Sequence, residues 1–197
     1  MPMYELNESA RELLFSAART ANTFSPEPVS DAQIEALYEL AKWGPTSMNT
    51  QPLRLVLARS AEAKAKVVAH LFDGNKPKAE MAPLVAVVAA DLQFHETLPE
   101  VFPVYPGAKD MFADEAYRTQ FAISQAWLQA GYFIVGVRAL GLAVGPMLGV
   151  NTAGIDADLL SGTSLRTIMV MNIGKPGENP WFDRLPRLDY ARAVTAL

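Results

Sequence analysis

The chain has 197 residues, a formal net charge of −4 and no cysteine. At this length one domain is expected, over residues 1–197. The lack of cysteine excludes disulfide scaffolds, thiolate zinc sites, iron–sulfur ligands and a cysteine nucleophile, and the acidic balance argues against a nucleic-acid binder.

Apolar residues make up 50% of the chain and charged residues only 19%, below the roughly 25% typical of globular domains. A well-filled core would account for this balance. Apolar surface that is buried in an oligomer or under a cofactor would also account for it, and we favour this second interpretation.

No segment of the sequence predicts membrane insertion or export. The N-terminal residues include acids and lack an apolar signal segment. The uncharged stretch between Arg118 and Arg138 contains three glutamines and a serine, which favours a helix buried in a soluble protein over a membrane span. We therefore expect a cytoplasmic protein.

Hydrophobic periodicity and turn residues predict an α+β fold, with a sheet packed between helices. In chain order we expect helix 8–21, helix 31–43, strand 53–58, helix 60–72, strand 84–90, helix 114–140, helix 153–160 and strand 165–173.

Several local signals support these elements. Ser30 and Gln33 have the spacing of a capping box, and Gly44-Pro45 ends the second helix. The helix 114–140 is apolar nearly all round, so it should cross the core. Residues 98–114, rich in proline and aromatic side chains, predict an irregular lid or dimer arm, and GLAVGPMLG (141–149) predicts a glycine-rich turn.

Several familiar catalytic motifs are absent from the sequence. It holds no GxGxxG after a strand, no Walker loop and no GxSxG elbow. His70 and His95 have no second ligand at a metal-binding spacing, so no metal site is expected. Tyr38 and Lys42 match a dehydrogenase spacing, but residues four apart on a helix are neighbours in any case, and no nucleotide-binding unit precedes them.

The loop GPTSMNTQP (44–52) places hydroxyl and amide side chains between two prolines. A stiff polar loop of this kind suits a planar ligand with many hydrogen-bonding edges, although an ordinary capped turn would have a similar composition.

This loop resembles the P-S-S-x-N-x-Q-P signature of the FMN-dependent nitroreductase superfamily. Other segments that resemble that family follow in the same order, namely ARTANTF (18–24), Asn75-x-x-Lys78, Gln125, GLAVGPMLG (141–149) and DRLP (183–186). The segments AARTANTF, KWGPTSMNTQP, GPMLG and RLPRL are similar to the malonic semialdehyde reductase group within it.

The resemblance implies a nitroreductase-like fold with a mixed, mainly antiparallel sheet, a long central helix and a C-terminal tail extending onto a partner subunit. It also implies a homodimer with the active site at its interface. The implied cofactor is FMN, with NADH or NADPH as hydride donor.

The FMN-binding residues that the resemblance implies are Arg19, Thr20, Asn22, Pro45, Thr46, Ser47, Asn49, Asn75, Lys78, Gln125, Pro146, Leu148, Gly149 and Arg184. Arg19, Thr20 and Arg184 would hold the phosphate. Asn75 and Lys78 would face the pyrimidine edge, and the backbone amides of Leu148 and Gly149 the N5 and O4 edge. Pro45, Thr46, Ser47 and Asn49 would come from the partner subunit.

The sequence departs from the family pattern at several positions. Ala18 stands where the family has the first arginine of a doublet, and Phe182 where it has a C-terminal basic residue. Leu148 replaces a frequent acidic residue, and Leu53 an aromatic one. Phosphate binding therefore depends on fewer charges, and weaker FMN binding is expected.

The mechanism implied is ping-pong hydride transfer through flavin N5, in which no side chain acts as a nucleophile. Malonic semialdehyde, a nitroaromatic compound, a quinone or an enone would each be a suitable acceptor. Phe102, Tyr105 and Phe112 are expected to roof the site, and Arg54 or Arg118 to pair with a substrate carboxylate.

Two other interpretations stay open at this point. The first is a flavin-binding protein without efficient turnover, which the charges missing at Ala18 and Phe182 suggest. The second is a dimerisation domain with no ligand.

Overall fold

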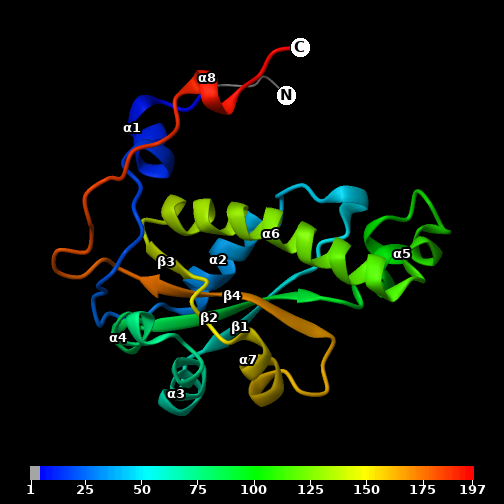
Figure 1. Ribbon diagram of the computed structural model, residues 1–197, viewed down its shortest axis with the longest axis horizontal. Helices are drawn as coiled ribbons and strands as arrows, with labels where there is room; N and C mark the ends of the chain where they lie inside the picture. The colour runs from blue at the N-terminus through cyan, green and yellow to red at the C-terminus, as the bar shows by residue number, and fades with distance from the viewer. Residues whose placement is uncertain (1–4) are drawn as a thin grey trace.

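A four-stranded antiparallel sheet organises residues 5–197, which are the residues that the computed structural model describes (Figure 1). The strands are β1 (Leu53–Ala58), β2 (Leu84–Asp91), β3 (Ala143–Met147) and β4 (Leu165–Gly174), in the order β1-β2-β4-β3. Every neighbouring pair is antiparallel. The α+β class is thus confirmed, and the described sheet is antiparallel rather than mixed. Residues 1–4 of the expected domain lie outside the described part.

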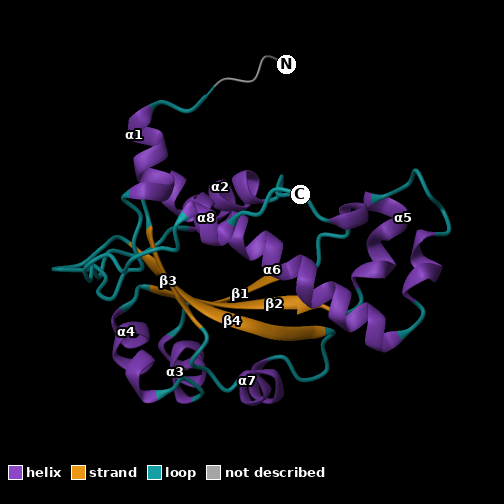
Figure 2. Ribbon diagram, turned by 45° about the horizontal axis from the view of Figure 1, so that its top comes forward, coloured by secondary structure: helices purple, strands orange, loops and turns teal. Residues whose placement is uncertain are grey.

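The helices cover both faces of this sheet (Figure 2). Their bounds are α1 (Glu8–Arg11), α2 (Asp31–Ala41), α3 (Ala61–Ala69), α4 (Lys76–Met81), α5 (Leu98–Val101), α6 (Glu115–Ala139), α7 (Thr152–Leu159) and α8 (Tyr190–Ala193). Helices α2 and α6 lie over one face, and α3, α4 and α7 over the other.

Strand β2 separates two hydrophobic cores. Successive strand residues point to opposite faces, so Leu84, Ala86 and Val88 join the core under α2 and α6, while Val85 and Val87 join the core under α3 and α7. All five are almost completely buried. This explains the unbroken apolar run of the strand, which has covered faces on both sides.

Helix α6 spans the first core and confirms the expected long central helix. Asp114 caps its N-terminus by accepting a hydrogen bond from the amide of Tyr117. Gly136 lets the helix approach α2 closely, since a Cβ there would lie 3.0 Å from a methyl group of Leu37. No helix of residues 5–197 is long and apolar enough to cross a membrane. The cytoplasmic location stays a prediction.

The predicted turn at 141–149 is wrong, because residues 143–147 form the edge strand β3 paired with β4. Pro146 is tolerated there because an edge strand leaves one side without ladder hydrogen bonds. The close approach of the N-terminal segment requires glycine at position 145, since a Cβ there would lie 2.9 Å from the carbonyl oxygen of Ala21.

Three other expectations are corrected. The first helix ends at Ser16 in a π-helical turn rather than at residue 21. Helix α4 was not expected. Residues 98–114 are more regular than an irregular arm, since they contain α5 and the 3-10 turn Ala108–Phe112.

The capping box of α2 is confirmed and allows a stability test. Ser30 Oγ accepts the Gln33 amide at 3.2 Å, and Gln33 Oε1 accepts the Ser30 amide at 2.9 Å. We expect Ser30→Ala to lower the free energy of unfolding by about 1 kcal/mol in urea titrations. Ser124→Ala, at an exposed interior position of α6, serves as the control. Equal stability of the two variants would contradict the role of the cap.

Candidate functional site

The N-terminal segment 18–24 lies between strand β3 and the C-terminal tail. The Ala21 amide donates to the carbonyl of Val144 at 3.2 Å, and the Asn22 amide to that of Pro180 at 3.0 Å. The Thr23 hydroxyl donates to the carbonyl of Glu178 at 2.7 Å. These bonds hold the expected phosphate-binding residues of the N-terminus beside the tail that carries Arg184.

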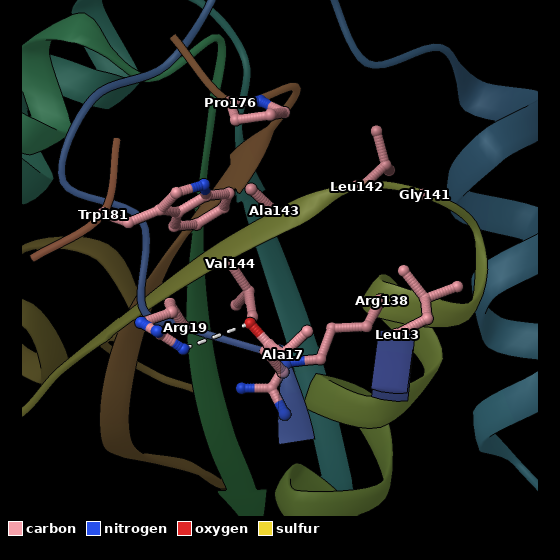
Figure 3. Close-up of a pocket in the computed structure, with 11 residues that line it drawn as sticks. Leu13, Ala17, Arg19, Arg138, Gly141, Leu142, Ala143, Val144, Pro176 and Trp181 are labelled. Atoms are coloured by element: carbon pink, nitrogen blue, oxygen red, sulfur yellow. Dashed lines mark hydrogen bonds between the residues drawn. The ribbon is translucent and has the colours of Figure 1, made fainter. Parts of the chain in front are cut away.

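Three arginines meet at this junction and form what we call the arginine cluster, Arg19, Arg138 and Arg184. Each donates to backbone carbonyls of residues 14–18. Within residues 5–197, none of the three pairs with a carboxylate. Figure 3 shows Arg19 and Arg138 reaching toward Ala17.

Burial and neighbouring positive charge lower the pKa of two of these arginines. Burial, together with the charge of Arg184, lowers the pKa of Arg138. Desolvation and the charges of Arg19 and Arg187 lower the pKa of Arg184. A cluster of positive charge without a carboxylate is a favourable place for an anion. Thr20, which the sequence also placed here, is exposed.

A second group of expected residues meets where the chain leaves β3. Asn75 Nδ2 donates to the Gly149 carbonyl at 3.1 Å, and the Phe72 amide donates to the same oxygen at 2.9 Å. Lys78 follows Asn75 by three residues and lies in α4. The sequence separation of Asn75 and Gly149 is large, so their contact is a product of the fold.

The backbone at this point offers hydrogen-bond donors. In the described part of the chain, the amides of Leu148 and Gly149 donate to no protein acceptor. The Leu148 side chain is 66% exposed, so the segment lies at the surface. Two adjacent free amides can bind acceptor atoms on the edge of a ligand. Pro146, two residues earlier, is half-buried.

A third group contains the polar loop and Gln125. Gln125 Oε1 accepts the Ser47 amide at 2.8 Å, so α6 fixes the loop. Asn49 Nδ2 donates to the Val101 carbonyl at 2.7 Å, and Thr46 Oγ1 accepts the Gln51 amide at 3.2 Å. The Ser47 side chain is exposed and makes no hydrogen bond to residues 5–197.

The backbone of this loop is held in an unusual conformation. Met48, Asn49 and Gln51 have positive φ angles of 54°, 52° and 44°. Non-glycine residues rarely adopt this region, and it persists where surrounding contacts fix it. Pro45 is exposed at the start of the loop. No hydrogen bond of the described structure joins this group to Asn75, Gly149 or the arginine cluster.

Comparison with known proteins identifies the family. The model of the nitroreductase family matches residues 16–175. The chain belongs to the nitroreductase family. This is a family of FMN-dependent oxidoreductases.

Individual relatives of this nitroreductase-family chain cover nearly its whole length. It is 51% identical to a Streptomyces coelicolor protein named NADH dehydrogenase/NAD(P)H nitroreductase, over 98% of both chains. It is 43% identical to a protein of the same name from Caulobacter, again over 98% of both chains.

Two solved structures share the fold at low identity. A nitroreductase from Bacillus subtilis superposes with a TM-score of 0.84 at 19% identity, covering 97% of this chain and all of the other. A nitroreductase from Exiguobacterium sibiricum, solved in complex with FMN, gives a TM-score of 0.84 at 16% identity, covering 99% of this chain and all of the other.

The substrate residues expected for this nitroreductase-family chain are in part engaged elsewhere. Phe112 is 1% exposed and packs edge-on against Phe94, with ring centroids 4.8 Å apart. It belongs to the core, so its placement in a roof over the site is wrong. Phe102 is half-buried, and Tyr105 is exposed on the segment between α5 and α6.

The two arginines proposed as substrate counter-charges already have partners. Arg54 pairs with Asp91 at 2.9 Å and also donates to two backbone carbonyls. Arg118 donates to the carbonyls of Leu92 and Phe112. Both guanidinium groups stabilise local structure, so a substrate carboxylate would have to compete with these contacts.

Sequence reasoning missed Arg138. It ends the long apolar stretch of α6, where the sequence shows it only as the boundary of that stretch. The available signal was its isolation, because it is the sole charged residue between Arg118 and the end of the helix. A charge at that place, on a helix that crosses the core, must find a polar partner.

Proposed function

We propose that this chain is an FMN-dependent NAD(P)H oxidoreductase that acts as a homodimer. The observation that carries the proposal is the pair of free backbone amides at Leu148 and Gly149, held beside Asn75. When bound, FMN supplies the redox chemistry, because its N5 accepts a hydride from a reduced nicotinamide and passes it to an oxidised substrate.

The residues present fit this cofactor. The arginine cluster has no carboxylate partner in residues 5–197 and suits a dianionic phosphate. Asn75 and the free amides offer hydrogen-bond donors to the acceptor atoms of the flavin ring. The side-chain Nδ2 of Asn22 donates hydrogen bonds to the backbone carbonyls of Thr20 and Pro180, so its Oδ1 is left as an acceptor.

Lys78 has an electrostatic role in this proposal. Its ammonium group makes no hydrogen bond or ion pair within the described residues, unlike its neighbour Lys76, which pairs with Asp73 at 2.7 Å. A free cation near the pyrimidine edge favours negative charge on the ring system and so raises its reduction potential.

Residues 45–49 and Gln125 complete the site from the partner subunit. This assignment is supported by the hydrogen bonds of the described residues, none of which links them to the other groups within one chain. Exposed aromatic side chains offer the surface that a dimer would bury, namely Tyr38 on α2, Trp43 just after this helix, and Trp127 and Tyr132 on α6.

The proposed substrate is malonic semialdehyde or a nitroaromatic compound. The similarity of AARTANTF and RLPRL to the malonic semialdehyde reductase group supports the first. The names of the relatives support the second. The Val101 carbonyl that accepts from Asn49 of the polar loop is followed by Phe102, which is half-buried, and Tyr105 is exposed on the same segment.

Absorption spectroscopy tests the proposal. Purified protein, incubated with FMN and desalted, should keep the visible bands of oxidised flavin. Anaerobic NADH or NADPH should then bleach these bands rapidly, and malonic semialdehyde or a nitroaromatic compound should restore them. Retained flavin that is reduced only slowly would indicate a binding protein without turnover. Protein that stays colourless after reconstitution would refute the proposed function.

A further inference from the structure

A small cavity opens at the arginine cluster (Figure 3). It has a volume of about 230 Å³ and lies between the end of α6, the start of β3 and the C-terminal tail. Its walls include Ala18, Arg19, Arg138, Leu142 and Trp181. Pockets for whole ligands run from about 300 to 1,000 Å³, so this cavity would take one end of a larger molecule.

Arg138 stands out among the residues of this cavity. Its Nη1 donates to the Leu14 carbonyl at 3.2 Å, but its Nε is buried and has no hydrogen-bond partner in the described structure. A buried donor without a partner costs free energy, and native structures rarely keep one without a reason. Nη2 of Arg138 likewise makes no hydrogen bond within the described residues, so the guanidinium keeps donors for an acceptor in the cavity that it lines.

The two arginines in the cavity wall favour an anion. Arg19 and Arg138 both line it, and the charge of Arg184 is close enough to lower the pKa of Arg138. A purely structural explanation is that the three arginines cap the carbonyls at the end of the N-terminal helical turn. That role explains the bonds to residues 14–18, but it leaves the Nε of Arg138 unpaired.

The residue at position 18 also supports an anion bound in this cavity. Ala18 lines the cavity and contributes only a methyl group, where the family pattern has a basic residue. The small side chain leaves space in the cavity that Arg138, near the end of α6, also lines. A charge missing from the N-terminal segment is thus available from the central helix.

We propose that Arg138 is a phosphate-binding residue of this chain, which joins Arg19 and Arg184 around the phosphate monoester of FMN. The inference rests on the proposed function and deepens it. It identifies which residue compensates for Ala18, and it assigns the small cavity to the phosphate end of the cofactor rather than to its ring.

Binding titrations of the apoprotein with FMN and with riboflavin, which lacks the phosphate, test this assignment. Arg138→Gln should raise the Kd for FMN by about tenfold to a hundredfold, the loss expected for a charge-assisted hydrogen bond. The Kd for riboflavin should stay unchanged. Arg166→Gln removes an arginine on β4 outside the cavity and should change neither value.

The outcomes separate the two proposals. A wild-type protein that does not bind FMN would refute the proposed function itself. If the wild type binds FMN, then equal losses for FMN and riboflavin in Arg138→Gln, or no loss for either, would overturn the role of Arg138. If Arg138→Gln does not fold, Arg138→Lys decides, because it keeps the charge and loses the guanidinium fork. A lower preference of this variant for FMN over riboflavin supports the assignment, and an unchanged preference overturns it.

Discussion

Gly149→Val is expected to weaken FMN binding by about a hundredfold, the effect of losing two hydrogen bonds. A Cβ at Gly149 would lie 2.8 Å from Asn75 Nδ2 and 3.3 Å from a ring carbon of Phe72. The amide of Asn75 would have to leave the Gly149 carbonyl, and the free backbone amides would be displaced with it. Fluorescence titration of the apoprotein with FMN measures the change.

Gly74→Ala is the matched control for this variant. It lies next to Asn75, and a Cβ there meets no atom within 4 Å. The control should bind FMN with wild-type affinity and unfold at the same temperature. Wild-type FMN affinity in Gly149→Val would show that the amides of residues 148 and 149 do not contact the cofactor.

Heterodimers are expected to show that each active site uses both subunits. Gly149→Val disables the group beside Asn75, and Ser47→Trp fills the polar loop that Gln125 fixes. At an FMN concentration well below the raised Kd of Gly149→Val, each homodimeric variant should be inactive. A heterodimer of the two, isolated with two affinity tags, has one site with both defects and one with none. It should therefore show about half of the wild-type activity if the sites lie across a two-fold interface.

A control heterodimer, with both substitutions in the same chain, should give the opposite result. When both substitutions are placed in one chain and paired with a wild-type chain, every shared site carries one defect, and the heterodimer should be inactive. If each site instead lay within one chain, this control would keep half of the activity, and the first heterodimer would have none. NAD(P)H oxidation with a nitroaromatic acceptor gives the measurement.

Local signals in the sequence predicted most of the helices and three of the four strands. The capping box of Ser30 and Gln33 and the apolar run of β2 each depend on neighbours in sequence, so they can be recognised without the fold. Strand β3 could not be recognised in this way. Gly145 and Pro146 have the composition of a turn, and only pairing with the distant β4 makes this segment a strand.

The candidate site, like the fold, was predictable where local motifs mark it and not where distant contacts decide it. The motifs led to Arg19, Asn75, Gly149 and the polar loop, and the fold brings Asn75 to Gly149 and Gln125 to Ser47. Composition misplaced Phe112, because an aromatic-rich segment looks the same whether it packs inward or outward. Its burial is decided by contacts with Phe94 and Phe121, which lie outside the segment.

The length of α6 has a consequence for how this protein tolerates insertions. Gln125 holds the polar loop and Arg138 lies in the cavity wall, on the same helix. Thirteen residues at 1.5 Å each place them about 20 Å apart along its axis. One inserted residue between them would turn one end against the other by about 100°. The helix therefore acts as a spacer of fixed length and phase. Insertions between these two residues should abolish FMN binding, whereas insertions in the exposed tail after Arg184 should be tolerated.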